Sequence, residues 1–283
     1  MSLDALENAA GLDPVATKIT SIVHAALPTP VKDVLHGVWL GHPLHPVLVQ
    51  VPVGAWTSAA ILDALPGSGT TPDVLIGVGL VGLVPAVVTG WTDFSDLHEQ
   101  QQRVALVHAA SNITGGVLYA SSLVARRRGN RLLGKLLGWA GYATAGLGSY
   151  LGGHLAYRQS AGTNHAESVP HLTDPGWHDI GAIDDLPEGK PVSRRLGEVN
   201  LMVVRKGGRA DVLAGRCSHL DGPLAGGHLR VERGEDCIAC PWHGSTFRLR
   251  DGAVVHGPAT APQPVFRTRL VQGRLHVLLE GAG

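Results

Sequence analysis

Two short motifs near the C-terminal end constrain the fold of this chain more than any other feature. The first is Cys217-x-His219 and the second is Cys240-x-x-His243, with residues 220–239 between them. An iron-sulfur centre with two cysteines on one iron and two histidines on the other needs this set of donors. Structural zinc sites usually pair like ligands within a half-site instead. Because each motif supplies one sulfur and one nitrogen, we expect two loops to converge on one [2Fe-2S] centre.

The residues around these motifs resemble a known family. CSHLDGPL, CPWHGSTF and the tail DGAVVHGPATAPQPVFRTRLVQGRLHV are similar to the ferredoxin-type Rieske domain, over about residues 177–277. The resemblance implies a cluster ligated by the two cysteines and two histidines, beneath a cover loop that contains Gly257 and Pro258. The segment between the motifs is longer than usual, which predicts an added hairpin around Glu232–Asp236.

Four residues near the motifs define the subtype. Gly222 and Trp242 stand where Rieske proteins of quinol-oxidising complexes carry a disulfide, so the resemblance implies no such clamp here. Ser245 is placed to donate to a cluster sulfur, with Trp242 beside the cluster, whereas Phe247 replaces a tyrosine. Fewer hydrogen bonds to the sulfurs mean a lower reduction potential. We therefore predict a low to intermediate potential.

Composition argues against some functions and shows that charged residues are unevenly distributed along the chain. The 283 residues have room for two domains. The 23 basic residues equal the 23 acidic ones, which argues against nucleic acid as a partner. Two of the three cysteines belong to the motifs, so no disulfide framework is expected. Between residues 38 and 125 the ionisable residues other than histidine and tyrosine are few: Asp63, Asp73, Asp93, Asp96, Glu99 and Arg103.

Four long apolar runs follow one another in this half of the chain. They are Val38–Leu62, Val74–Trp91, Val104–Ala125 and Leu136–Tyr157. About 20 apolar residues cross the hydrocarbon layer of a membrane, so we predict an all-α four-helix transmembrane bundle with both termini on one side. Gly148 and Gly152 would let two of these helices approach closely. The alternative is a soluble bundle of buried helices.

This half also resembles a family. GHPLHPVLVQVPVGAW and YLGGHLAYRQSAG are similar to a bacterial membrane family of unassigned function, DUF2231, over about residues 35–162. The resemblance implies a multi-pass protein of the bacterial cytoplasmic membrane and no particular chemistry. Residues 15–27 predict an amphipathic helix that packs on its own domain or lies on the membrane surface. The expected organisation is thus α + β: N-terminal segment 1–37, membrane domain 38–160, linker 161–176 that lets the domain swing, and small antiparallel β Rieske domain 177–283.

Basic residues decide the expected orientation. The loop before the fourth run is rich in them: Arg126, Arg127, Arg128, Arg131 and Lys135. The positive-inside rule puts this loop in the cytoplasm and the Rieske domain on the outer side of the membrane. The run ARRRGNRLL would then serve as an internal twin-arginine signal. The alternative is a loop that only anchors the chain, with the Rieske domain in the cytoplasm.

Histidines of the membrane half are candidates for a second redox site. In an up-down bundle His42, His45, His98, His108 and His154 all fall at one end. The favoured interpretation is that they hydrogen-bond to lipid headgroups or neighbouring helices. Ionisable residues within a membrane are also functional candidates, so the alternative is that His45, His108 and His154 bind a haem b or a quinone.

Three functions remain open on the sequence. The first is a membrane-anchored carrier of single electrons between a membrane or quinone-linked donor and a partner redox protein. The second is a quinol-oxidising or haem-containing membrane oxidoreductase, and the third is a redox sensor. A Rieske oxygenase is not expected, because that family's mononuclear iron domain follows the cluster and this chain ends at Gly283.

Overall fold

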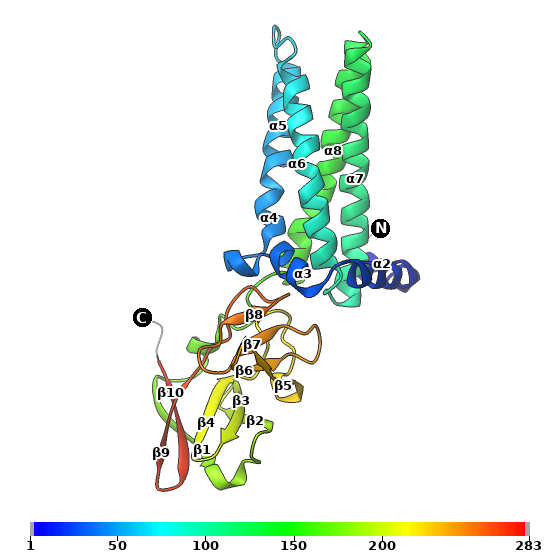
Figure 1. Ribbon diagram of the computed structural model, residues 1–283. Helices are drawn as coiled ribbons and strands as arrows, with labels where there is room; N and C mark the ends of the chain where they lie inside the picture. The colour runs from blue at the N-terminus through cyan, green and yellow to red at the C-terminus, as the bar shows by residue number, and fades with distance from the viewer. Residues whose placement is uncertain (1–2, 281–283) are drawn as a thin grey trace. The chain divides into compact units, whose positions relative to one another are not determined.

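The computed structural model describes residues 3–280, which form two compact units. The helical unit contains the chain up to Pro28 and Pro43–Ala161. The β unit contains Thr29–His42 and the chain from Gly162 onward. The segment treated above as residues 1–37 is thus divided between the two units. Both units are drawn in Figure 1.

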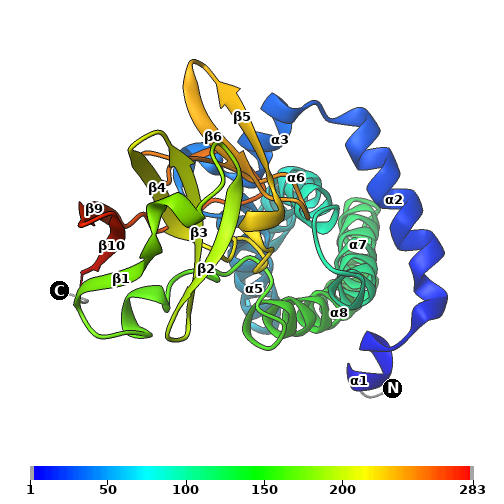
Figure 2. The ribbon, with the colours of Figure 1, turned by 90° about the horizontal axis from the view of Figure 1, so that it is seen from below.

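Four long helices make up most of the helical unit. They are α5 (Gln50–Ala64), α6 (Thr71–Phe94), α7 (Glu99–Arg127) and α8 (Arg131–Tyr157). Short connections join them, so successive helices run in opposite directions, and seen end-on in Figure 2 they surround a common centre. Four shorter helices accompany them: α1 (Leu3–Glu7), η1 (Ala10–Leu12), α2 (Asp13–Ala26) and α4 (Leu44–Leu48).

The helix boundaries follow the predicted runs with one correction. The first run does not begin as a long α-helix at Val38, where only the short 3-10 helix η2 (Val38–Leu40) forms. Gly41 adopts a left-handed conformation (φ 72°) and Pro43 is extended, so the helical stretch starts at Leu44. The other three runs lie within α6, α7 and α8, and α2 confirms the predicted amphipathic helix.

Two stretches are long and apolar enough to cross a membrane. Leu44–Ala64 has a mean hydropathy of 1.4 and Thr71–Phe94 one of 2.1. Helices α7 and α8 are longer, 29 and 27 residues, but they begin or end with charged residues and carry more polar groups. The arrangement of four long helices is therefore as predicted, whereas length and composition qualify only the first two stretches as candidate spans.

The β unit contains three antiparallel sheets, in agreement with the predicted small antiparallel domain. The first has the order β1 (Gly176–Ala182), β10 (Arg274–Leu279) and β9 (Arg267–Val271). The second consists of β2 (Pro191–Leu196), β3 (Val199–Lys206) and β4 (Arg209–Ala214). The third consists of β5 (His228–Glu232), β6 (Glu235–Ala239), β7 (Thr246–Arg248) and β8 (Val254–His256). Five short helices complete the unit: α3 (Thr29–His36), η2 (Val38–Leu40), η3 (Val169–His171), η4 (Ile183–Asp185) and η5 (Leu224–Gly226). The predicted hairpin around residues 232–236 is confirmed as β5 and β6.

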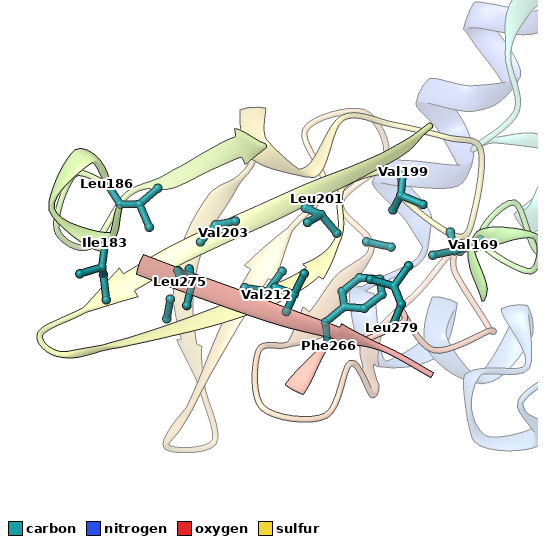
Figure 3. Packing of buried hydrophobic residues seen from close by; sticks show 14 residues of the cluster. Val169, Ile183, Leu186, Val199, Leu201, Val203, Val212, Phe266, Leu275 and Leu279 are labelled. Carbon is teal, nitrogen blue, oxygen red and sulfur yellow. The ribbon is translucent and has the colours of Figure 1, made fainter. Parts of the chain in front are cut away.

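Strand β3 is buried on both faces and separates two hydrophobic cores. Leu201 and Val203 face the core that Figure 3 shows, together with strand β10. Met202 and Val204 face the second core, which includes both motif cysteines. Ala166 and Val169 are buried in the first core. Part of the segment predicted as a linker is therefore packed on the β unit.

Candidate metal centre

The two motifs lie in loops that leave the ends of strands. The first follows β4, and the second joins β6 to β7. In the first loop the amide of Cys217 donates to the carbonyl oxygen of Gly222 at 2.8 Å. In the second loop the amide of Cys240 donates to the carbonyl oxygen of Ser245 at 2.8 Å. These bonds close each loop into a tight turn held by a rigid strand.

The structure brings the four predicted ligands together as a sulfur pair and an imidazole pair. The Cys217 thiol donates a hydrogen bond to the sulfur of Cys240. The rings of His219 and His243 have centroids 5.2 Å apart and lie at 88° to each other. Two imidazoles bound about 2 Å from one tetrahedral metal ion have centroids about 5 Å apart. The donor set and its arrangement thus fit two irons with unlike ligands.

Burial distinguishes the two pairs. Both cysteines are buried, whereas both histidines are half-buried and reach the surface. The Cys217 hydrogen bond, helped by the backbone amides of Trp242 and His243, lowers the pKa of Cys240 to about 7. The same bond, together with burial, raises the pKa of Cys217. The imidazole pair is therefore the side of the site that is accessible to solvent.

Ser245 joins the sulfur pair to the cover loop. Its hydroxyl is fully buried and hydrogen-bonds to the sulfur of Cys217. Its oxygen also accepts a hydrogen bond from the amide of Ala259 at 3.0 Å. Ala259 follows Gly257 and Pro258, so these two predicted residues lie in a loop that Ser245 holds over the site.

Gly222 and Trp242 are neighbours across the two loops. A Cβ atom on Gly222 would lie 2.7 Å from Sγ of Cys240 and 3.3 Å from Cδ2 of Trp242. The indole of Trp242 is 48% exposed, with its ring centroid 6.4 Å from that of His243. An exposed aromatic ring thus flanks one imidazole, at the place where the sequence resemblance implied that no disulfide forms.

Sequence reasoning missed the buried amide of Gln263. Its Oε1 accepts from the amide of Ser218 at 3.0 Å, and its Nε2 donates to the carbonyl oxygen of Ala214 at 2.8 Å. The Ser218 hydroxyl donates to the carbonyl oxygen of Ala261 at 2.8 Å. These bonds tie the first ligand loop to the chain beyond the cover loop. No local pattern marks Gln263, because its partners are far away in the sequence.

Sequence reasoning also missed Asp33, on α3. One carboxylate oxygen accepts from the amide of Gly257 at 2.9 Å, and the other accepts from Nδ1 of His256 at 2.8 Å. A Cβ atom on Gly257 would lie 3.1 Å from Val38. The segment 29–42 therefore packs on the cover loop and belongs to the support of the site.

In the helical unit the predicted histidines separate. The rings of His45 and His108 are neighbours, with centroids 6.4 Å apart and planes at 80° to each other. His154 does not extend this pair into a three-histidine site but bonds through Nε2 to the carboxylate of Glu7 at 2.7 Å. His42 is exposed and belongs to the β unit.

Some basic side chains of the predicted loop bind partners within the helical unit. Arg126 is buried and forms ion pairs with Asp63 and Asp73. Arg131 pairs with Asp73 at 2.9 Å, and Lys135 donates to the carbonyl oxygen of Asp63 at 2.8 Å. Three of the five basic residues used to predict orientation thus have partners inside the unit.

Comparison with known families divides the chain in the same order. Residues 41–165 match the family described as a predicted membrane protein (DUF2231). Residues 176–267 match the Rieske [2Fe-2S] domain. Both resemblances expected from the sequence are thereby confirmed.

Individual relatives match the β unit. The ferredoxin subunit of anthranilate 1,2-dioxygenase from Burkholderia cepacia is 34% identical over 104 residues, which is 36% of this chain and 90% of the subunit. A probable 3-ketosteroid-9-alpha-monooxygenase oxygenase component from Rhodococcus rhodochrous is 34% identical over 109 residues, but this chain spans only 26% of it.

Solved structures match over a similar share of the chain. The ferredoxin of carbazole 1,9a-dioxygenase from Nocardioides aromaticivorans is 26% identical, with a TM-score of 0.34 over 38% of this chain and all of that one. A complex of reduced oxygenase and oxidized ferredoxin in carbazole 1,9a-dioxygenase includes a chain that is 28% identical, with a TM-score of 0.34 over 39% of this chain and 99% of that one.

Proposed function

This chain belongs to the Rieske [2Fe-2S] family, and we propose that it is a membrane-anchored electron carrier of the ferredoxin type. The observation that carries the proposal is the convergence of Cys217, His219, Cys240 and His243 under a cover loop held by Ser245. When bound, a [2Fe-2S] cluster supplies reversible one-electron transfer.

The residues of the β unit divide the work of holding and tuning such a cluster. The buried cysteines would hold one iron and the half-buried histidines the other, which leaves the imidazoles near solvent. The Ser245 hydroxyl is positioned to donate to a sulfur. Gly222 leaves no room for a larger side chain beside Cys240. Few hydrogen bonds to the sulfurs support a low to intermediate reduction potential for the cluster.

The proposed partner is a redox protein that docks over the imidazole pair. The 34% identical relative is the ferredoxin subunit of anthranilate 1,2-dioxygenase. In this chain the half-buried His219 and His243 and the exposed Trp242 form the accessible edge of the site. A flat aromatic residue at such an edge suits a transient protein interface.

The helical unit is proposed to cross the membrane four times. Beyond the two candidate spans, α7 and α8 also expose apolar side chains that water would not favour, including Val117 and Leu136, each 59% exposed. Lipid contact accounts for such outward-facing residues on helices. The buried ion pair of Arg126 with Asp63 fits a charge that is neutralised inside the bundle.

The Rieske unit is proposed to lie on the outer side of the bacterial cytoplasmic membrane. The positive-inside rule counts Lys and Arg residues near the ends of the spans and does not use net charge. The ion pairs of Arg126 and Arg131 therefore leave its support for a cytoplasmic loop before α8 unchanged. A C-terminal reporter active only after export should be active, and a reporter active only in the cytoplasm should be silent. The reverse result would place the Rieske unit in the cytoplasm.

One preparation distinguishes the proposed carrier from the alternatives. Full-length protein is purified in detergent without oxygen, and optical and EPR spectra are recorded before and after dithionite. A carrier should show the rhombic EPR signal of a reduced Rieske centre. Reduction of that centre by a quinol alone would favour the quinol-oxidising enzyme instead. A colourless protein with zinc and no EPR signal would overturn the proposal.

A further inference from the structure

Two histidines of the helical unit occupy matching places on two helix pairs. His45 on α4 lies against α6, with its Nδ1 2.8 Å from the carbonyl oxygen of Ala86. His108 on α7 lies against α8, with its Nδ1 2.7 Å from the carbonyl oxygen of Gly148. Each ring is thus oriented by a backbone carbonyl of the neighbouring helix.

A glycine four residues beyond each carbonyl makes room for the ring. A Cβ atom on Gly90 would lie 2.9 Å from Cε1 of His45. A Cβ atom on Gly152 would lie 3.1 Å from Cε1 of His108. The histidine, carbonyl and glycine of one helix pair therefore have counterparts in the other.

The match extends along the helical unit. Three residue pairs, each separated by 63 positions in the sequence, meet between the helix pairs: His45 with His108, Trp56 with Tyr119, and Asp63 with Arg126. The aromatic rings are stacked with centroids 4.3 Å apart. Equivalent residues of two repeats meet each other only along the axis that relates the repeats. The histidine pair therefore lies on a pseudo-two-fold axis.

The separation of the two rings and the angle between their planes match those of two ligands on opposite sides of one metal ion. Their centroids are 6.4 Å apart and their planes lie at 80°. Two imidazoles bound about 2 Å from a metal ion and directly opposite each other have centroids about 6.3 Å apart. Because Nδ1 of each ring donates to a carbonyl, Nε2 of the neutral ring is the nitrogen with a lone pair. In His108 the side-chain nitrogen of Asn112 lies 3.4 Å from this Nε2 and would have to move aside for a metal ion to bind. Metal-bound histidines usually have this second hydrogen bond.

We propose that His45 and His108 are the two axial ligands of a b-type haem. Among residues 3–280 no further His, Cys, Asp or Glu side chain joins His45 and His108 as a third metal ligand, so a bare ion at this place would find only two protein ligands. A haem brings four nitrogens of its own and needs ligands only on its two faces. Two polar side chains lie beside the rings: the Thr89 hydroxyl is 3.5 Å from Nδ1 of His45, and the Asn112 side-chain nitrogen is 3.4 Å from both ring nitrogens of His108.

The proposed site lies towards one membrane surface. In α7, His108 precedes Arg126 by 18 positions, which corresponds to about 27 Å at 1.5 Å per residue. That length is close to the thickness of the hydrocarbon layer, about 30 Å. The haem would thus lie near one face of the layer, with the Asp63–Arg126 pair near the other. The inference uses the membrane placement proposed above but does not depend on the cluster.

The test is a haem count on full-length protein purified in detergent and incubated with hemin. The wild type should bind one haem per chain, with a Soret band and a sharp α band after dithionite. Ferric protein should give a strongly anisotropic low-spin EPR signal. The reason is that axial rings at nearly right angles leave two d-orbitals of the iron close in energy. His45→Ala and His108→Ala should each lower haem occupancy at least tenfold, and His108→Met should retain haem with a changed spectrum.

Matched controls separate ligand loss from unfolding. His42→Ala and His154→Ala should keep the low-spin haem, and every variant should keep the rhombic Rieske signal. Wild-type protein that shows the Rieske signal but binds no haem would overturn the haem site while leaving the electron carrier intact. Haem retained by both alanine variants would overturn it equally. Haem without a Rieske signal would instead contradict the proposed carrier.

Discussion

The carboxylate of Asp33 accepts a hydrogen bond from Nδ1 of His256 at 2.8 Å, although 223 positions separate the two residues in the sequence. The second oxygen of the same carboxylate accepts from the amide of Gly257. Both partners belong to the edge of the cover loop, whose Ala259 amide bonds to Ser245. A helix from the N-terminal part of the chain thereby stabilises the loop over the metal centre.

Asp33→Ala should destabilise the β unit by about 1–3 kcal/mol, because two partly buried donors lose a charged acceptor. Asp33→Asn should have a smaller effect, since it can still accept from the Gly257 amide. Thermal loss of the cluster absorption measures both. Asp184→Ala is the control, since its exposed ion pair with Arg205 contributes little. Equal effects of Asp33→Ala and Asp184→Ala would show that the cover loop does not depend on α3.

Ser245→Ala should lower the reduction potential of the cluster. A hydrogen bond that favours the reduced state by about 1 kcal/mol corresponds to about 40 mV, since 59 mV is a tenfold change for one electron. Protein-film voltammetry measures the shift. Ser193→Ala, an exposed serine of β2, should leave the potential unchanged. A wild-type potential above about +200 mV would contradict the predicted subtype.

Cys240→Ser should abolish the rhombic EPR signal, because one iron loses a thiolate ligand. Cys237→Ser is the matched control. Cys237 is also buried, on β6 opposite Arg230, but it is outside both motifs. It should keep the signal and the iron content. Loss of the cluster in both variants would mean that general stability rather than ligation decides the outcome.

Asp63→Ala should destabilise the helical unit by about 3–5 kcal/mol, because it removes a partner of the buried Arg126 charge. Replacing both residues by leucine should cost less, since no uncompensated charge remains. Temperature-dependent loss of monodisperse protein in detergent measures the effect. Arg128→Ala, on the exposed side of the same loop, should be close to neutral. If Asp63→Ala and Arg128→Ala had the same thermal stability, the ion pair would not contribute to the stability of the helical unit.

Local patterns were sufficient for much of the β unit and for the four ligands. The spacing of Cys217, His219, Cys240 and His243 identified the donor set, because ligands of one half-site lie within a single turn. The hairpin between β5 and β6 was predictable from a length difference and turn residues. The positions of the helices followed from runs of apolar residues. The start at Leu44 was missed because the backbone conformations of Gly41 and Pro43 interrupt the helix within a run that is apolar throughout.

The sequence by itself determined which atoms are present for metal binding and which segments are apolar enough to form the four helices. Only the tertiary structure decided which distant groups meet. It brought Asp33 to the cover loop, buried Arg126 against Asp63, and joined His45 to His108 while leaving His154 with Glu7. The physical reason is that spacing and periodicity report neighbours along one element, whereas partners on different elements are set by packing.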